Sequence, residues 1–422
     1  MHDRNRHLGW HTMSVLTGMR VVESSAFVAV PLAGMTLAQM GAEVIRVDHI
    51  GGGMDAGRWP LAPSGQSLFW AGLSKGKKSV AVDLRHPEGR DLVQRLATAP
   101  GPDAGMFLTN LPAKGWTDAD TLHALRDDMI TVTLAGDRHG RPQVDYTVNP
   151  SLGVTHMTGA EGSTDPVAHA VPAWDLLAGQ MCVSTLLAAE RHRLRAGSGQ
   201  AAHLTLKDVA AAALGHLGLI GDVALNGQDR AKAGNALYGA YGQEFICRDG
   251  RRVMVIGLTA RQWSKLLEVT DSQEAMAALE RQLGVSLKDE GQRWRSRHAI
   301  TQVLRPWFAD RPVSAFADKF DAAGLTWSEV RTMSQALAND PDLSLDNPMF
   351  SAVMQPGIGT YLSPAHPVSL SQSPRVPAAA APVLGAHTEE VLGDVLAMDD
   401  TEVAHLFDAG IVQSAEASRT AA

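Results

Sequence analysis

Hydrophobic and polar residues alternate along the first third of the chain in a pattern that predicts strands followed by helices. Short β-branched and apolar runs are each followed by a longer segment in which apolar residues recur at helical spacing. The predicted strands are 19–23, 43–48, 79–84, 105–110 and 129–135, and the predicted helices are 31–40, 87–97 and 118–126. Such repetition is typical of a mainly parallel sheet that helices cover on both faces. We therefore expect an α/β domain at the start of the chain.

A second pattern, centred on Asp175, begins a long apolar helix. Pro172 favours an extended approach, and apolar residues recur at roughly helical spacing up to Arg195, so Asp175 falls at or near a helix N-terminus. That end of a helix favours a carboxylate in its charged form. The carboxylate can cap the free N–H groups of the helix, or it can act as a nucleophile toward an activated acyl carbon. The residue alone favours the cap, because Asp is among the preferred capping residues.

The pattern changes in the second half of the chain. A predicted strand at 202–206 and one long predicted helix at 207–225 precede a polar, glycine-containing crossing segment. We expect a large domain at 13–226 that carries Asp175, a small α+β domain at 236–339, and a C-terminal segment at 340–422, rich in Pro and Gly, that ends in two short helices.

Composition narrows the range of partners. The 422 residues are 45% hydrophobic and 19% charged, as in an ordinary globular protein, and the formal net charge of −8 argues against a general nucleic-acid binder. Two cysteines provide neither a disulfide framework nor zinc-ligand spacing, and a reducing cytoplasm fits. The longest apolar run, 209–225, is broken by His216 and Asp222, so we expect no membrane span. Residues 1–12 are polar, without the apolar core of a signal peptide, and are interpreted as an extension before Met13.

The strand ends select the candidate site loops, because ligands of parallel sheets gather at the carboxyl ends of the strands. These loops are Ala26–Ala29, His49, Val82–Arg85, Asn110–Lys114 and Gly136–Arg138. Lys75, Lys77, Lys78 and Arg85 flank one strand and would suit phosphates, although a solvated lysine cluster is equally compatible. Gly51–Gly53 lacks the spacing of a dinucleotide fingerprint, which disfavours a Rossmann-type oxidoreductase or nucleotide-binding regulator.

The chain resembles the class III CoA-transferases, the CaiB/BaiF family, over nearly its whole length. The resemblance is carried by Gly18–Val22, Pro31–Met35, Gly41–Val47, Lys77–Leu84, Asp175 with its helix, Gly199–Gln200 and Leu384–Thr388. Further segments resemble the members of the family that move CoA within one branched, unsaturated diacid: Ser67–Leu73, Val144–Pro150, Pro172–Asp175, Gly239–Gly242 and Asp346–Phe350.

The resemblance implies a Rossmann-like parallel-sheet domain completed by the returning C-terminal segment, a smaller α+β domain, and a homodimer of two chains interlocked like rings. It implies that Asp175 attacks an acyl-CoA and forms first an aspartyl anhydride and then an aspartyl-CoA thioester. CoA enters as part of the substrate, and no tightly bound cofactor or metal is expected. The positions that line CoA in relatives correspond to Val28, Ala29, His49, Val82, Arg85, Asn110, Leu111, Pro112, Lys114 and Gln143.

The sequence departs from the family pattern around CoA and leaves the substrate open. His49 occupies a place where formyl-CoA transferases carry Arg, and their glycine-rich flap is not evident. With Trp174 beside Asp175, the segment Tyr238–Gly242 is a candidate to cover a small closed pocket, with Tyr238 and Tyr241 as its aromatic residues. We consider transfer within one dicarboxylate, transfer to a separate dicarboxylate, and an acyl-CoA racemase that would draw an acid/base pair from His156, His169 and His216.

Overall fold

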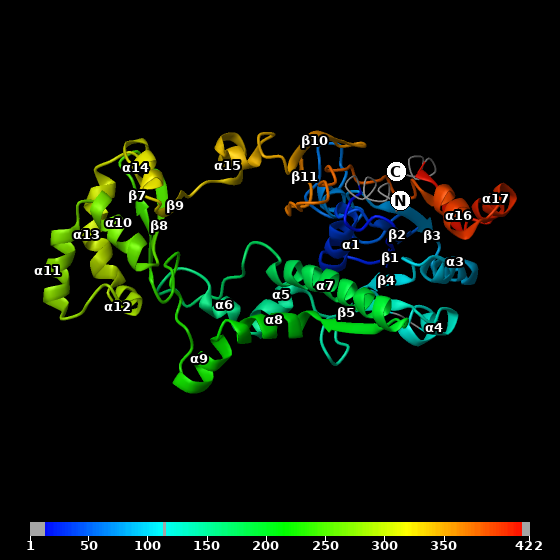
Figure 1. Cartoon of the computed structure of the whole chain (residues 1–422), viewed down its shortest axis with the longest axis horizontal. Coiled ribbons are helices and arrows are strands. Elements are labelled where there is room, and N and C mark those ends of the chain that lie inside the picture. The colour runs from blue at the N-terminus through cyan, green and yellow to red at the C-terminus, as the bar shows by residue number, and fades with distance from the viewer. Residues whose placement is uncertain (1–12, 113–114, 416–422) are drawn as a thin grey trace, which may run out of the picture. The chain divides into compact units, whose positions relative to one another are not determined.

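A computed structural model describes residues 13–112 and 115–415. The chain forms two compact units (Figure 1). Within the described residues, unit 1 takes in 13–152, 170–222 and 341–415, and unit 2 takes in 153–169 and 223–340. The chain therefore enters unit 2 at 153–169, before it returns to unit 1 with the helix of Asp175. The sequence pattern had assigned this excursion to the large domain.

Unit 1 is built on a seven-stranded sheet with the order β12-β3-β2-β1-β4-β5-β6. All neighbours in this sheet are parallel except β12, which pairs antiparallel with the edge strand β3. The strands are β1 (Arg20–Ser24), β2 (Glu43–His49), β3 (Lys78–Val82), β4 (Met106–Thr109), β5 (Ile130–Ala135), β6 (Ala201–Thr205) and β12 (Val412–Gln413). The predicted mainly parallel sheet is confirmed.

Two hydrophobic cores lie on the two faces of this sheet. One face packs against α1 (Ala29–Gln39), α5 (Asp145–Ser151), α7 (Ala173–Ala196) and α8 (Leu206–His216). The other face packs against α3 (Pro87–Thr98), α4 (Ala119–Leu125), α16 (Thr388–Leu396) and α17 (Asp400–Asp408). The strands bury side chains on both faces, as expected for a parallel sheet covered by helices.

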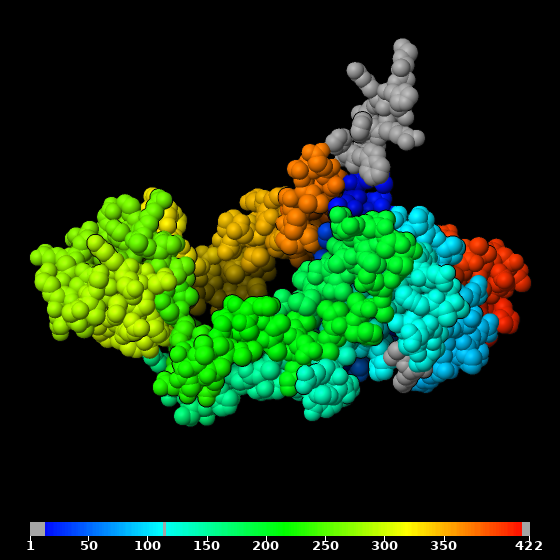
Figure 2. Space-filling view, turned by 60° about the horizontal axis from the view of Figure 1, so that its bottom comes forward, coloured from blue at the N-terminus to red at the C-terminus, as the bar shows by residue number. Residues whose placement is uncertain are grey.

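The C-terminal segment returns to unit 1 and completes its sheet. The hydroxyl of Thr388 accepts from the backbone of Ala81 at 3.2 Å and donates to the Gln413 carbonyl at 2.8 Å, which ties α16 to both β3 and β12. Figure 2 shows α16 and α17 (red) beside α3 (blue-cyan). Smaller elements of unit 1 are α2 (Leu68–Leu73), η3 (Pro341–Leu343) and the antiparallel hairpin β10 (Phe350–Gln355) and β11 (Gly359–Pro364).

Unit 2 is a small α+β body with its own core. Its antiparallel sheet consists of β7 (Tyr241–Ile246), β8 (Arg252–Gly257) and β9 (Thr326–Glu329). Its helices are α6 (Val154–Met157), α10 (Ala260–Val269), α11 (Gln273–Leu283), α12 (Glu290–Arg295), α13 (Arg297–Ala309), η2 (Val313–Ala315), α14 (Ala317–Ala322) and α15 (Met333–Asn339). The core is aromatic, with Phe245 and Phe308 stacked at 4.1 Å.

The predicted single helix over 207–225 is wrong. The chain forms α8 and then α9 (Leu219–Asn226), which are bent by 65° relative to each other. Gly218 has a φ of +78°, a left-handed conformation that ends a helix and that glycine adopts without steric cost. Among the described residues, no single helix is long and apolar enough to cross a membrane, and only this bent pair passes the test of length and composition.

Candidate active site

Asp175 lies in the first turn of α7, where α7 crosses α1 at very close range. One turn further along α7, a Cβ added to Gly179 would lie 2.6 Å from the Ala29 carbonyl oxygen. Residues i and i+4 share one face of a helix, so Asp175 faces the same way as Gly179. The close crossing places Asp175 near the start of α1 and the loop that follows β1.

The carboxylate that caps α7 belongs to Asp145, not to Asp175. The buried side chain of Asp145 in α5 accepts a hydrogen bond from the backbone N–H of Trp174 at 2.7 Å and a longer one from that of Asp175 at 3.4 Å. In the same helix, Asn149 accepts from the indole N–H of Trp174 at 3.1 Å. The capping role that the residue type favoured for Asp175 is therefore wrong, and none of the described residues donates a hydrogen bond to its carboxylate.

The environment of Asp175 raises its pKa to about 6, mainly through burial and also through the nearby negative charge of Asp145. Burial and the charge of Asp145 thus outweigh the effect of the helix N-terminus, which was expected to favour the charged form of Asp175. A carboxylate with this pKa is mostly ionised at neutral pH and is more basic than an ordinary aspartate. Cys182 also lies on α7, and burial raises the pKa of its thiol to about 12, which disfavours the thiolate.

Arg58 is the cation that acts on Asp175, because its charge lowers the pKa of that carboxyl. Its guanidinium lies over the rings of Phe27 and Phe69, 5.5 and 5.1 Å from their centroids. Phe27 adopts a left-handed φ of +66°, which is unusual for a bulky residue, and its backbone N–H donates to both carboxylate oxygens of Asp55 at 2.9 Å. Sequence reasoning did not identify Arg58, because it follows an irregular stretch with no motif.

The described CoA positions from Val28 to Pro112 lie at the carboxyl ends of β1 to β4, and Gln143 lies after β5. Val28 and Ala29 begin α1, Val82 ends β3, and Leu111 and Pro112 follow β4. Lys114 lies outside the described residues. His49 and Arg85 line an open groove of about 580 Å³, whose other lining residues are Ile50, Gly52, Gly53, Met54, Asp83 and Gly410.

Two of the predicted positions use their side chains to hold the protein itself together. The amide of Asn110 accepts from the Ala26 N–H at 2.9 Å and donates to the Ala26 carbonyl at 2.7 Å, which fixes the loop after β1. Gln143 accepts from the hydroxyl of Thr147 at 2.7 Å. These contacts favour a positioning role for Asn110.

Two of the three lysines near the start of β3, Lys77 and Lys78, are used in ion pairs within the protein, and the third, Lys75, is buried, which lowers its pKa. Lys77 is buried, donates to the Pro31 carbonyl and forms an ion pair with Glu23 at 2.7 Å, while burial lowers its pKa to about 8. Lys78 pairs with Glu43 at 2.7 Å and with Glu390 at 2.8 Å. Both residues stand at the amino end of β3, opposite to the edge that carries Arg85, so the sequence cluster is split in space.

The two tyrosines proposed to cover the pocket have different environments in unit 2. Tyr241 is fully buried in the core of that unit, where its hydroxyl lies 3.1 Å from the Thr301 hydroxyl, so the expectation that its ring covers a substrate is wrong. Tyr238 is 46% exposed and contacts Trp294. Of the three histidines suggested for racemase chemistry, His156 and His169 belong to unit 2, and His216 is exposed on α8.

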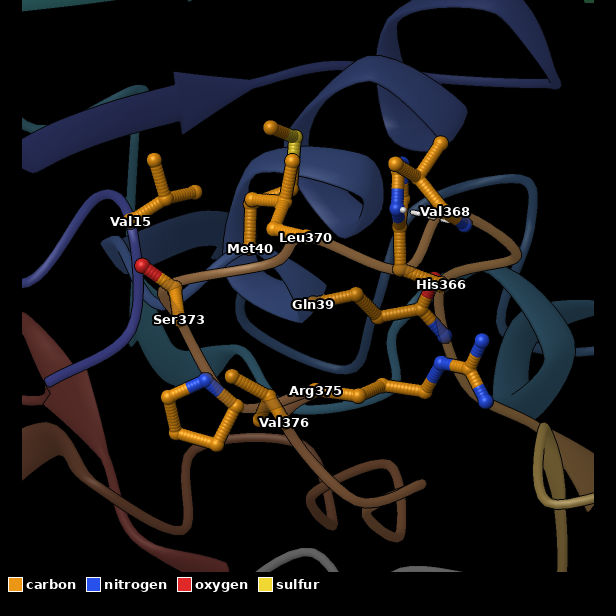
Figure 3. Close-up of a pocket in the computed structure, with 10 residues that line it drawn as sticks. Val15, Gln39, Met40, His366, Val368, Leu370, Ser373, Arg375 and Val376 are labelled. Atoms are coloured by element: carbon orange, nitrogen blue, oxygen red, sulfur yellow. Dashed lines mark hydrogen bonds between the residues drawn. The ribbon is translucent and has the colours of Figure 1, made fainter. Parts of the chain in front are cut away.

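A smaller hollow of about 80 Å³ lies at the other end of α1 (Figure 3). Gln39, the last residue of α1, lines it together with His366 and Arg375 from the C-terminal segment. Because α1 has 11 residues, the two ends of the helix are about 15 Å apart. The hollow is therefore separate from the region around Asp175, which lies near the start of α1. No group of three or more His, Cys, Asp or Glu among the described residues could hold a metal ion.

Comparison with known proteins identifies the family. The chain is 52% identical over 399 residues to 2-methylfumaryl-CoA isomerase of Chloroflexus aurantiacus, covering 94% of this chain and 98% of that one. It is 26% identical over 413 residues to human succinyl-CoA:glutarate CoA-transferase, covering 95% and 90%. A CaiB/BaiF family protein from Brucella suis has the same fold, with a TM-score of 0.75 at 21% identity over 91% of this chain and all of that one. The family model of CoA-transferase family III matches residues 16–388, and the chain belongs to this family of enzymes.

Proposed function

We propose that the protein transfers CoA between the C1 and C4 carboxyl groups of mesaconate, converting 2-methylfumaryl-CoA into 3-methylfumaryl-CoA. The observation that carries this proposal is the 52% identity to 2-methylfumaryl-CoA isomerase over nearly the full length of both chains. Supporting it is an aspartate at the start of α7 that is freed from capping by Asp145 and has an arginine nearby.

In the proposed reaction, an oxygen of the Asp175 carboxylate attacks the C1 thioester carbon and expels CoA thiolate, which leaves a mixed anhydride. The thiolate attacks the aspartyl carbonyl, the anhydride C–O bond breaks, and free mesaconate remains beside an aspartyl-CoA thioester. The C4 carboxylate then attacks that thioester and expels the thiolate again, which forms a new anhydride. The thiolate attacks the C4 carbonyl of this anhydride, the C–O bond to Asp175 breaks, and the carboxylate of Asp175 is regenerated. Holding the thiolate and the acid close converts each attack into an intramolecular step.

CoA is proposed to lie along the sheet edge. The backbone at Val28 and Ala29 presents the first N–H groups of α1, which suit an anionic group. His49 and Arg85 in the groove between the ends of β2 and β3 suit phosphates. Leu111 and Pro112 supply apolar walls, whereas the side chain of Val82 is fully buried in the core of unit 1 and Asn110 acts by holding the loop after β1.

The nucleophile is tested by mass spectrometry of the intact protein. Incubation with 2-methylfumaryl-CoA should add the mass of CoA less one water, located at Asp175 by peptide mapping, and hydroxylamine should trap the activated carboxyl only when an acyl-CoA is present. Asp175→Asn should form no adduct and lose orders of magnitude in turnover. An adduct on another carboxylate, together with an active Asp175→Ala variant, would contradict the assignment.

The alternative is an intermolecular transferase for another dicarboxylate, as the name of the human relative describes for that protein. Reaction of 2-methylfumaryl-CoA with an excess of isotopically labelled mesaconate or succinate separates the two functions. Retention of the acid predicts 3-methylfumaryl-CoA with little label and no succinyl-CoA. Heavy labelling or efficient succinyl-CoA formation would reject the intramolecular transfer.

An interlocked homodimer is also proposed. The chain leaves unit 1 at residue 153, returns at 170, leaves again at 223 and returns at 341. Long crossings of this kind are expected where one chain threads around another. A cytoplasmic location is proposed from the two free, buried cysteines.

A further inference from the structure

Arg58 has a side chain that is held in place yet unused within the protein. Its backbone is anchored, because its N–H donates to the Asp55 carbonyl at 3.2 Å and its carbonyl accepts from the hydroxyl of Ser67. Its guanidinium lies over the faces of Phe27 and Phe69. Among the described residues, none forms a hydrogen bond or ion pair with this guanidinium.

The support beneath Arg58 is a buried charge network rather than a loose loop. Asp55 is 2% exposed, holds the Phe27 N–H, and pairs with the fully buried Arg46 at 3.3 Å. Arg46 in turn pairs with Asp48 at 2.9 Å. One end of the Arg58 cradle is thus fixed to β2, and Phe27, whose backbone N–H is held by Asp55, has a left-handed conformation. A rigid cradle of this kind lowers the entropy lost when a ligand binds.

The geometry leaves the edges of the guanidinium available. Stacking on an aromatic ring uses the flat face of the group, whereas its N–H donors point outward in the plane and match a carboxylate in a two-pronged hydrogen bond. Asp175 is near enough to feel the charge of Arg58 but does not form an ion pair with it. Arg58 lies over Phe27, two residues before α1, and α7 crosses α1 at Ala29, one turn beyond Asp175, so both groups lie at the start of α1.

We propose that Arg58 is the specificity-determining residue that binds the free carboxylate of the diacyl-CoA while the thioester end faces Asp175. This inference rests on the proposed function and adds the group that selects dicarboxylic over monocarboxylic acyl chains. It also gives the free diacid an anchor during the reaction. When both carboxylates are free beside the aspartyl-CoA thioester, either can bind Arg58, and their exchange presents the other one to Asp175.

The test compares two acyl-CoA substrates that differ in the second carboxylate. The rate of CoA addition to Asp175 is measured by rapid quench and intact mass with 2-methylfumaryl-CoA and with crotonyl-CoA, which lacks that carboxylate. Wild type, Arg58→Gln, Arg58→Lys and the control Arg85→Gln are compared. The quantity of interest is the ratio of the two rates, since effects on CoA binding cancel in it.

Arg58→Gln is expected to lower this ratio roughly 10- to 100-fold, the value of a charge-assisted hydrogen bond, whereas any slowing that comes from the lost effect of Arg58 on the pKa of Asp175 is shared by both substrates and cancels in the ratio. The ratio for Arg58→Lys should fall between those for wild type and Arg58→Gln, because lysine keeps the charge but lacks the planar set of donors. Arg85→Gln should slow both substrates alike. Equal slowing of both substrates by Arg58→Gln, or an unchanged ratio, would overturn the role of Arg58. A wild-type protein that forms no adduct at Asp175 with either substrate would overturn the proposed function itself.

Discussion

Replacing Asp175 by Asn is expected to stabilise the protein at neutral pH while removing its activity. The pKa of Asp175 is raised from 3.8 to about 6 by burial and by Asp145. The folded state therefore keeps the proton to a higher pH than the unfolded chain, and stability falls as the pH rises between these two values. Asn cannot ionise, so the variant does not lose this stability. Ionisation of Asp175 therefore lowers the free energy of unfolding of the wild-type protein at neutral pH.

The size of this stability difference follows from the shift in the pKa of Asp175. A difference of about two pH units corresponds to about 3 kcal/mol when it is fully expressed. Because Asp175 is only partly buried, we expect roughly 1–3 kcal/mol between acidic and neutral pH. For a domain of unit 1's size, each kcal/mol changes the Tm by roughly 2–4 °C.

The assay is thermal unfolding of wild type, Asp175→Asn and Asp175→Glu in a series from pH 4.5 to 8. The Tm advantage of the Asn variant should grow with pH and level off above the pKa of about 6. The Glu variant keeps an ionisable group and should follow wild type. A Tm difference between wild type and Asp175→Asn that stays constant over the whole series would refute the raised pKa and the reasoning built on it.

Three other outcomes are expected. Turnover should rise with pH through about 6 as Asp175 ionises, and Asp145→Asn, which keeps a capping oxygen but removes the charge, should move this limb to lower pH in a pH–rate profile. Gly34→Ala should destabilise the protein by about 3–5 kcal/mol in denaturant unfolding, since its Cβ would lie 1.7 Å from the Glu23 carboxylate in a buried ion pair, whereas Gly72→Ala, with open space, should be nearly neutral. Light scattering should find a dimer at micromolar concentration, and a stable, active monomer would contradict the interlocked assembly.

Local patterns were sufficient for most of the fold. The strands and helices of the sheet could be predicted because short apolar, β-branched runs and a helical spacing of 3.6 residues, with Pro at 31 and 87 near helix starts, are properties of short segments. The kink at Gly218 was missed because the apolar pattern continues through it, and only the left-handed backbone there reveals the break. The hairpin β10–β11 lay in a stretch whose prolines and glycines favoured irregular structure.

Only part of the site could be predicted from the sequence. Asp175 and the strand-end loops could be located, because a helix start and the carboxyl edge of a parallel sheet are both readable from order along the chain.

The functions of individual charges were decided by tertiary structure alone. The cap of α7 comes from a residue 30 positions earlier, and Lys77 is neutralised by Glu23, 54 positions away. The guanidinium of Arg58 is positioned by contacts with Phe27 and Phe69, which belong to different segments of the chain. Spacing determines which residues share an element, whereas burial and charge pairing depend on how the elements pack, and that packing sets which carboxylate caps and which one is left to react.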